Sequence, residues 1–200
     1  MRAFCFLSAV AMRSDPSDRA EMVNQLLQGD TFEILEQQEK WSLVRCDYDG
    51  YEGWVDNKQW KPTTANPNMS MGNETSPATY AEQHFLDAPY LWGGRTIMGI
   101  DCSGLTQVCF RACGIRLLRD ASQQATQGLP IDNIAHGRRD DLCFFSNPQG
   151  RIIHVGIYMG DNRIIHASGQ VRIDTLTPEG IFNHELNTIT HRFHSIRRIQ

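Results

Sequence analysis

The sequence has no long uninterrupted hydrophobic run. No window of its 200 residues approaches the roughly 18 apolar residues of a membrane-spanning helix, so we expect no membrane span. An excess of positive charge is also missing, because 19 Lys and Arg stand against 23 Asp and Glu. This balance leaves no basic footprint for nucleic acid. With 40% hydrophobic and 21% charged residues, the composition favours a folded globular chain over a disordered one.

Cysteine is sparse, and the six cysteines form no CxxC pair. Several of them stand in apolar contexts such as FCF and VCF, which is typical of small buried residues. We therefore expect free thiols and a reducing compartment rather than a disulfide framework. P-loop, dinucleotide-binding and EF-hand signatures are absent from the sequence, and nothing in it calls for a cofactor.

The first twelve residues, MRAFCFLSAVAM, faintly resemble a signal peptide. Ser8 interrupts the apolar stretch, and the polar run that starts at Arg13 follows at once, whereas a secretory signal usually has a longer apolar region. We expect a first β-strand here and a cytoplasmic location. The alternative is an exported or periplasmic protein whose signal is missing from this sequence.

Residues 1 to about 62 read as short strands joined by tight turns. Strand-like runs occur at 31–35, 41–46 and 54–55, with the turn-forming pair Asp49-Gly50 between the last two. Residues 18–28 are compatible with a short helix or an irregular loop. This pattern, which ends in the segment GYEGWV, resembles bacterial SH3-like domains, and the resemblance implies a small β-barrel.

A polar connector follows the predicted barrel. The stretch KPTTANPNMSMGNETSP contains three prolines and has neither a helical nor a strand period. We therefore divide the chain into an SH3-like barrel over residues 1–62, a linker over 63–77 and a second domain over 78–200.

The second domain begins with helices and continues with strands. Apolar spacing predicts helices over 78–86 and 102–113, and a short one over 120–127. After Asp140 the strand-like runs LCFF, RIIHVGIYMG, NRIIHAS, VRID and THRFHSIRRI dominate. This order predicts an α+β domain with helices packed on an antiparallel sheet.

The motif Asp101-Cys102-Ser103-Gly104 stands at the start of the second predicted helix, where Asp101 is a suitable N-cap. The unpaired N–H groups and the dipole at a helix start favour negative charge, so we expect the pKa of the Cys102 thiol to be lowered. The same N–H groups are suited to hold an oxyanion. The alternative is a small buried cysteine that happens to begin a helix.

Two histidines interrupt apolar strands further along the chain. His154 and His166 flank the turn-forming segment MGDNR, which predicts a hairpin. Adjacent strands would bring the two imidazoles together, so that one could take the thiol proton while the other orients it. The alternative is a pair of histidines with a purely structural place in the sheet.

The ordered motifs YLWGG, DCSG, DLCFF, HVGIYMG and IIHAS resemble the NlpC-type cell-wall cysteine peptidases. This resemblance, over roughly residues 78–200, implies a compact papain-like fold. It also implies that Cys102 is the nucleophile, His154 the general base and His166 the third, orienting member of the catalytic group.

An SH3-like domain before such a catalytic domain resembles the bacterial γ-D-glutamyl-L-diamino-acid endopeptidases. The resemblance implies a cysteine peptidase that cuts murein stem peptides between D-Glu and Lys or diaminopimelate and releases L-Ala-D-Glu. It also implies recognition of the free L-Ala amine by an acidic residue beside the nucleophile and by the SH3-like domain. The expected substrate-binding residues are Asp101, Ser103, Tyr51, Glu21, Tyr90 and Trp92.

Other functions remain open at this level. The same site suits an amidase or acyltransferase, and an SH3-like domain beside a degenerate catalytic domain would make a non-catalytic wall-peptide binding protein. A zinc site on Cys102, Cys109 and Cys113 is disfavoured because their ends lie far apart along one helix. We place His191 and His194 on opposite faces of a strand, as surface or sheet residues rather than a chelating pair. We expect no metal.

Overall fold

The computed structural model describes residues 1–64 and 71–199. The chain divides into two compact units, the first formed by Met1–Ser70 with Leu91–Thr96 and the second by Met71–Tyr90 with Ile97–Gln200. No helix among the described residues is long and apolar enough to cross a membrane.

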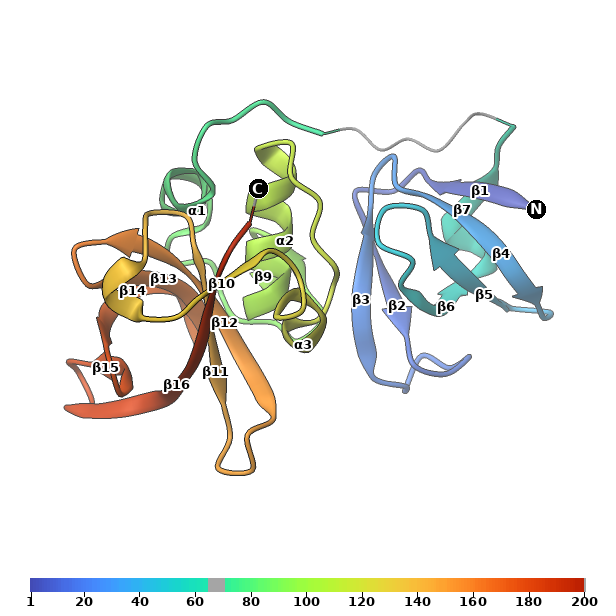
Figure 1. The fold of residues 1–200 in the computed structure, drawn as a ribbon. Helices are drawn as coiled ribbons and strands as arrows, with labels where there is room; N and C mark the ends of the chain where they lie inside the picture. The colour runs from blue at the N-terminus through green and yellow to red at the C-terminus, as the bar shows by residue number, and fades with distance from the viewer. Residues whose placement is uncertain (65–70, 200) are drawn as a thin grey trace. The chain divides into compact units, whose positions relative to one another are not determined.

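The first unit is an antiparallel SH3-like sheet (Figure 1). Its strand order is β3-β2-β6-β5-β4-β1-β7. Alternating residues point into one core, as in β5, where Ser42, Val44 and Cys46 are buried. The strands are β1 (Arg2–Cys5), β2 (Ala9–Arg13), β3 (Met22–Leu27), β4 (Thr31–Gln37), β5 (Trp41–Cys46), β6 (Glu52–Asp56) and β7 (Trp60–Pro62), with a 3₁₀ turn η1 (Asn57–Gln59).

The helix or loop expected over residues 18–28 is wrong, because strand β3 occupies most of this segment. Its register with β2 places Leu26 opposite Val10 and Asn24 opposite Met12. Buried Asn24 and Leu26 alternate with more exposed neighbours. The run MVNQLL suits either a helix or a strand, and pairing with β2 decides in favour of the strand.

Residues Leu91–Thr96 belong to the first unit although they lie far along the chain. The Arg95 guanidinium forms a buried ion pair with Asp30 at 3.2 Å, and the Arg95 backbone N–H donates to Gln25 Oε1. Gly93 has φ of +77°, and a Cβ there would stand 2.6 Å from the carbonyl oxygen of Met22. Glycine is therefore required where this segment crosses β3.

The second unit combines three helices with a seven-stranded antiparallel sheet of order β10-β16-β11-β12-β13-β14-β15, in which β15 also pairs with β16. The helices are α1 (Pro77–Phe85), α2 (Cys102–Ala112) and α3 (Ala121–Gln124), with a 3₁₀ turn η2 (Ile134–His136). The strands are β10 (Leu129–Ile131), β11 (Leu142–Ser146), β12 (Ile152–Gly160), β13 (Arg163–Ser168), β14 (Gln170–Thr177), β15 (Gly180–Asn183) and β16 (Thr188–Arg198). Of two further short strands, β8 (Arg95–Thr96) falls in the first unit and β9 (Gly99–Ile100) in the second.

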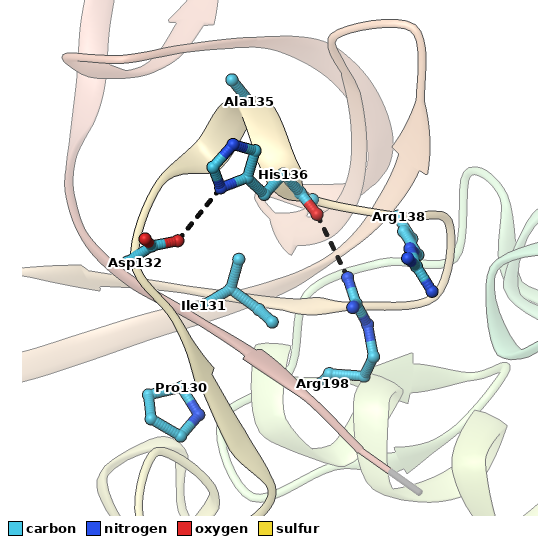
Figure 2. Close-up of a pocket in the computed structure, with 8 residues that line it drawn as sticks. Pro130, Ile131, Asp132, Ala135, His136, Arg138 and Arg198 are labelled. Carbon is cyan, nitrogen blue, oxygen red and sulfur yellow. Dashed lines mark hydrogen bonds and ion pairs between the residues drawn. The ribbon is translucent and has the colours of Figure 1, made fainter.

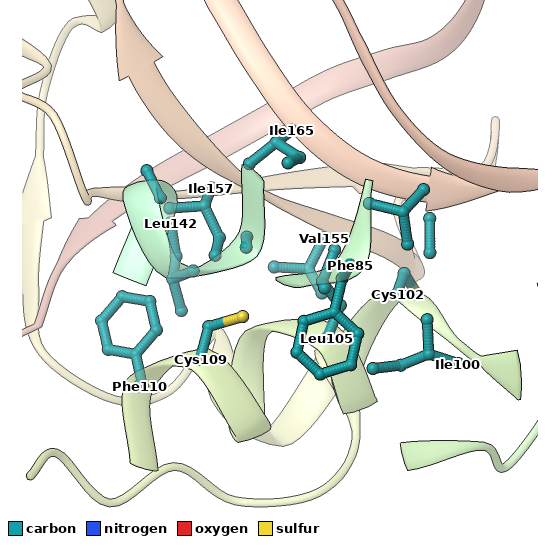
Figure 3. Packing of buried hydrophobic residues seen from close by; sticks show 14 of the residues in the cluster. Phe85, Ile100, Cys102, Leu105, Cys109, Phe110, Leu142, Val155, Ile157 and Ile165 are labelled. Atoms are coloured by element: carbon teal, nitrogen blue, oxygen red, sulfur yellow. The ribbon is translucent and has the colours of Figure 1, made fainter. Parts of the chain in front are cut away.

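The core of the second unit holds α2 against the sheet (Figure 3). Leu105 and Cys109 of α2 are fully buried with Val155 and Ile157 of β12 and Ile165 of β13. Each large apolar side chain buried in this way contributes about 1.5–3 kcal/mol of transfer free energy. This packing fixes the first turn of α2 beside the middle of β12.

The helices predicted over 78–86 and 102–113 are confirmed within a residue or two. The helix predicted over 120–127 is shorter, because α3 covers only Ala121–Gln124. Asp120 and Gln123 form a capping box at its start. The next residues turn away towards Gly128, which has φ of +70°.

Candidate active site

Cys102 is the first residue of α2, and its side chain is buried. Asp101 caps the helix, because its Oδ1 accepts a hydrogen bond of 2.6 Å from the Gly104 backbone N–H. Backbone N–H groups of Val155 and Ser103 act on the thiol and favour its ionised form. Val155 directly follows His154 in β12, so one N–H group that acts on the thiol belongs to the residue next to this histidine.

The expectation of a lowered pKa for the Cys102 thiol is wrong. Burial and, to a smaller extent, the negative charge of Asp101 raise the pKa of the thiol to about 12. The N–H groups and Arg119 lower the pKa of the thiol, but their combined effect is smaller than that of burial and Asp101. Desolvation of the thiolate therefore outweighs the helix start, and the resting group at neutral pH is the thiol. A nucleophilic Cys102 needs a base that takes its proton during attack.

The predicted hairpin is confirmed, and it brings two imidazoles together. His154 of β12 and His166 of β13 are both buried, and His154 Nε2 lies 2.8 Å from His166 Nδ1. His166 Nε2 in turn lies 3.0 Å from Asp174 Oδ2 of β14. A continuous chain of hydrogen-bonding groups thus runs from His154 through His166 to a carboxylate.

The carboxylate of Asp174 determines where the protons of this chain reside. A carboxylate accepts hydrogen bonds only, so His166 must carry its proton on Nε2. A neutral His166 then presents an unprotonated Nδ1, which accepts from the Nε2–H of His154. His154 Nδ1 therefore keeps its lone pair, and this nitrogen is the basic atom of the hydrogen-bonded series from His154 to Asp174. Burial lowers the pKa of both histidines, which keeps both neutral near pH 7.

Asp174 itself was missed by the sequence reasoning. Hydrogen bonds from His166 and Arg172 hold its pKa below the usual value against the opposing effect of burial. Arg172 binds both carboxylate oxygens, at 2.8 and 3.1 Å. The available signal was the alternation in VRID, because β14 pairs Arg172 with His166 and places Asp174 on the same face.

His191 of β16 lies against the histidine pair, a position that the sequence reasoning did not foresee. Its ring stacks on that of His154 with centroids 4.1 Å apart and an interplanar angle of 25°. Phe145 packs near both rings. His194 is exposed, so the two histidines of β16 do lie on opposite faces. Burial lowers the pKa of His191 to about 4.

Asp101 and Ser103 are engaged by a buried arginine. Arg119 donates to Asp101 Oδ2 at 2.6 Å, to Asp101 Oδ1 at 3.0 Å and to Ser103 Oγ at 2.8 Å. This bidentate pair neutralises the carboxylate charge beside Cys102. Arg119 was another residue that the sequence reasoning missed, because it lies in the loop after α2 and outside any recognisable motif.

The other predicted substrate-binding residues are distributed over both units. Tyr90 of the second unit is half-buried, and burial, together with the acidic groups Cys102 and Asp101 nearby, raises its pKa. Glu21, Tyr51 and Trp92 belong to the first unit. The exposed Trp92 indole N–H donates to Glu21 Oε1 at 2.6 Å. A common substrate site for these residues stays a prediction.

A separate hollow in the second unit has a volume of about 510 Å³ (Figure 2). Its polar lining includes Arg138, Arg198 and the exposed pair Asp132–His136. None of the predicted site residues lines it, and it offers neither a thiol nor paired buried histidines. The candidate active site is therefore the Cys102–His154–His166–Asp174 group.

Comparison with known proteins agrees with both units. Residues 87–190 match the NlpC/P60 family, and residues 12–59 match the bacterial dipeptidyl-peptidase Sh3 domain. These matches define the class as an SH3-like domain joined to an NlpC/P60 domain. The chain belongs to the NlpC/P60 family.

Curated relatives give the family match more detail. The chain is 40% identical over 116 residues to a gamma-D-glutamyl-L-lysine dipeptidyl-peptidase of Bacillus subtilis (strain 168), covering 54% of this chain and 38% of that protein. It is 36% identical over 123 residues to the probable endopeptidase NlpC of Escherichia coli (strain K12), covering 58% and 73%. The chain therefore spans little more than a third of the B. subtilis relative.

Among solved structures, an NlpC/P60 family protein from Bacillus cereus superposes with a TM-score of 0.54 at 23% identity. The superposition covers 99% of this chain and 63% of that one. NlpC2 from Trichomonas vaginalis gives a TM-score of 0.53 at 19% identity, covering 100% and 73%. At these identities the likeness supports the α+β fold with its SH3-like unit.

Proposed function

We propose that the protein is a cysteine peptidase that hydrolyses the γ-D-glutamyl–diamino-acid bond of murein stem peptides. It acts on peptides with a free N-terminal L-Ala and releases L-Ala-D-Glu. The observation that carries the proposal is the chain from His154 through His166 to Asp174, together with Cys102 at the start of α2, whose thiol is acted on by the backbone N–H of Val155, the residue after His154. The names of the relatives and the Sh3-domain match support the substrate class.

The neutral resting state sets the first chemical step. His154 Nδ1 takes the thiol proton as Cys102 Sγ bonds to the γ-carbonyl carbon of D-Glu. The resulting imidazolium donates its Nε2–H towards His166, whose orientation Asp174 maintains. Backbone N–H groups at the start of α2 stabilise the oxyanion.

The second half of the reaction returns the enzyme to its starting state. The bond between the γ-carbonyl carbon and nitrogen breaks, and His154 Nδ1–H protonates the departing amine of the diamino acid. A thioester between Cys102 and L-Ala-D-Glu remains. Water then attacks the thioester, gives one proton to His154 and releases the dipeptide, after which the proton returns to the thiolate.

Recognition of the L-Ala amine requires a negative charge that is not already neutralised. Asp101 is paired with Arg119, so Asp101 and Arg119 together contribute no net charge. We assign the countercharge to Glu21, whose carboxylate is held by Trp92. Ser103, Tyr51 and Tyr90 are proposed as hydroxyl partners of the peptide.

A peptide digest followed by mass spectrometry tests bond, nucleophile and amine recognition together. The substrates are L-Ala-γ-D-Glu-L-Lys, its diaminopimelate counterpart and the N-acetylated form of each. We expect L-Ala-D-Glu from the free-amine peptides alone, no product with Cys102→Ala, and a raised KM with Glu21→Gln. If acetylated and free-amine peptides were cleaved equally, recognition of the L-Ala amine by Glu21 would be refuted. No cleavage of any peptide would overturn the peptidase proposal.

A further inference from the structure

We propose that His154, His166 and His191 form an inhibitory site for a divalent transition-metal ion of the zinc type. The proposal rests on the proposed peptidase function for its consequence, but not for the binding itself. One ligand atom from each of the three histidines lies within 4.8 Å of the others. No other group of three His, Cys, Asp or Glu side chains within the described ranges comes together in this way.

The three imidazoles come from three strands and need only small movements to share an ion. Zinc binds imidazole nitrogens at about 2.0–2.1 Å, so two tetrahedral ligand atoms stand about 3.3 Å apart. His154 Nε2 and His166 Nδ1 are 2.8 Å apart, so their hydrogen bond must open by roughly half an ångström. An ion then takes the place of the proton between them.

His191 is the ligand that moves. Its ring is stacked on that of His154 at 25°, so the nitrogen lone pairs of the two rings lie in nearly parallel planes and do not converge on one ion. His191 is only partly buried, whereas His154 and His166 are fully packed. Rotation of His191 about its side-chain bonds turns a nitrogen towards the pair. The site is therefore completed by the ion rather than preformed.

The surroundings supply groups that typically support a metal-binding histidine. His166 donates Nε2–H to Asp174, which gives the arrangement of carboxylate, histidine and metal found around protein zinc ions. His191 Nδ1 lies 2.9 Å from Thr190 Oγ1, which leaves Nε2 for the ion. Asp174, Arg172 and Glu185 form one linked ion-pair group with a net charge of −1, which favours a cation nearby.

Metal binding at this place would stop the proposed reaction through a change of tautomer. A neutral imidazole that binds a metal through Nε2 carries its single proton on Nδ1. On metal binding His154 loses its Nε2 proton and gains one at Nδ1. That nitrogen is the atom that must accept the thiol proton, so the occupied enzyme has no general base for Cys102.

The matched variants for a test are His191→Phe and His194→Phe. Phenylalanine at position 191 keeps a flat ring against His154 but removes the lone pair, and His194 lies exposed on the other face of β16. In metal-free buffer we expect both full-length variants to hydrolyse the peptide within about threefold of wild type. Zn²⁺ should inhibit wild type and His194→Phe reversibly, with relief by EDTA. The inhibitory Zn²⁺ concentration should rise at least tenfold in His191→Phe.

Binding of Co²⁺, followed by its visible absorption, gives a readout that does not depend on turnover. Tetrahedral Co²⁺ absorption should appear in wild type and in Cys102→Ala, and it should be lost in His191→Phe. Equal zinc inhibition of wild type and His191→Phe would overturn the proposal. Loss of cobalt binding in Cys102→Ala would also overturn it, because the thiol would then be the ligand. Cobalt binding without peptide cleavage would refute the peptidase function and leave the metal site standing.

Discussion

Asp174 shows how one buried carboxylate controls two imidazoles. Its Oδ2 lies 3.0 Å from His166 Nε2, while Arg172 binds both of its oxygens. Because it can only accept, it fixes the proton positions on His166 and His154 in turn. The lone pair on His154 Nδ1 is the result. The reactivity assigned to Cys102 thus depends on a residue in β14, the fifth strand after α2 in the order of the chain.

We predict that Asp174→Asn lowers kcat by about 10- to 100-fold and changes KM little, because an amide that donates to His166 favours the wrong tautomer. The matched control is Glu185→Gln, which removes the exposed partner of Arg172 and leaves Asp174 in place. Steady-state kinetics on the tripeptide measures both variants. A wild-type kcat for Asp174→Asn would exclude the tautomer mechanism.

The residues that sequence reasoning could find are those with a local signal. Cys102 follows a helix cap, and His154 and His166 lie twelve residues apart on one hairpin, so short-range patterns place all three. Arg119 and His191 depend on how a loop and a distant strand return to the site. The direction of the Cys102 pKa shift was wrong for the same reason, because burial by β12 has no local signature.

At the scale of elements, the first turn of α2 depends on a buried ion pair. Asp101 both caps the helix and holds Arg119. Asparagine would keep the cap but leave Arg119 without its charged partner. Since removing one member of a buried pair typically costs about 3–5 kcal/mol, the helix start is one of the sensitive places in the fold.

We predict that Asp101→Asn lowers the free energy of unfolding by about 3 kcal/mol in urea denaturation. The same change should shift alkylation of Cys102 by iodoacetamide to lower pH, because the negative charge that raises the thiol pKa is gone. Asp132→Asn, which breaks an exposed pair, should alter neither quantity. An alkylation profile that stays in place would contradict this account of the thiol.

Strand β12 has a glycine where the histidine pair needs space. A Cβ at Gly156 would stand 2.8 Å from Ile164 Cδ1 and 3.0 Å from His166 Cβ. The first contact involves the end of a flexible side chain, whereas the second presses on the attachment point of the His166 ring. The strand can therefore accept the larger residue only by displacing His166.

We predict that Gly156→Ala reduces kcat several-fold, because His166 must give way by a few tenths of an ångström and a misplacement of about 1 Å can cost a factor of about 10². Adding Ile164→Val to Gly156→Ala removes the contact between the new Cβ and Ile164 Cδ1. The double variant should regain more of the wild-type melting temperature than of the wild-type kcat. Kinetics and thermal unfolding of the single and double variants separate the two effects. Unchanged kcat in Gly156→Ala would show that the position of His166 does not matter.

At the scale of the molecule, the fold follows from the sequence where patterns are local. Strands β4, β5 and β6 and helices α1 and α2 were predictable from alternation and apolar spacing, whereas the single strand expected in the first twelve residues is in fact two, β1 and β2. Strand β3 was not predictable, because its residues suit a helix until β2 pairs with them. The association of Leu91–Thr96 with the first unit was also unpredictable, since it depends on Arg95 reaching Asp30 across 65 positions of sequence.

Buried histidines make the stability of the molecule depend on pH. Burial lowers the pKa of His154, His166 and His191, that of His191 to about 4. An unfolded histidine titrates near 6.5, so below that pH the unfolded chain binds more protons than the folded one. Stability is therefore complete above about pH 6.5 and is lost as the pH falls towards the folded pKa values.

We predict that the urea midpoint falls between pH 7 and about pH 5.5, an interval in which ordinary carboxylates stay almost fully ionised. His191→Phe removes one of the three buried titrating groups and should flatten this decline. His84→Phe, a change at an exposed position, should keep the wild-type slope. An equal slope for His191→Phe and wild type would mean that His191 does not titrate in this window.

The measurement that tests the central claim most directly is the chemical trapping of the thioester. The enzyme is mixed with L-Ala-γ-D-Glu-L-Lys or its diaminopimelate counterpart, quenched in acid within one turnover and mapped by mass spectrometry. We predict L-Ala-D-Glu attached to Cys102, with the other five cysteines unmodified and serving as internal controls. Attachment to another cysteine, or full turnover by Cys102→Ala, would contradict this prediction.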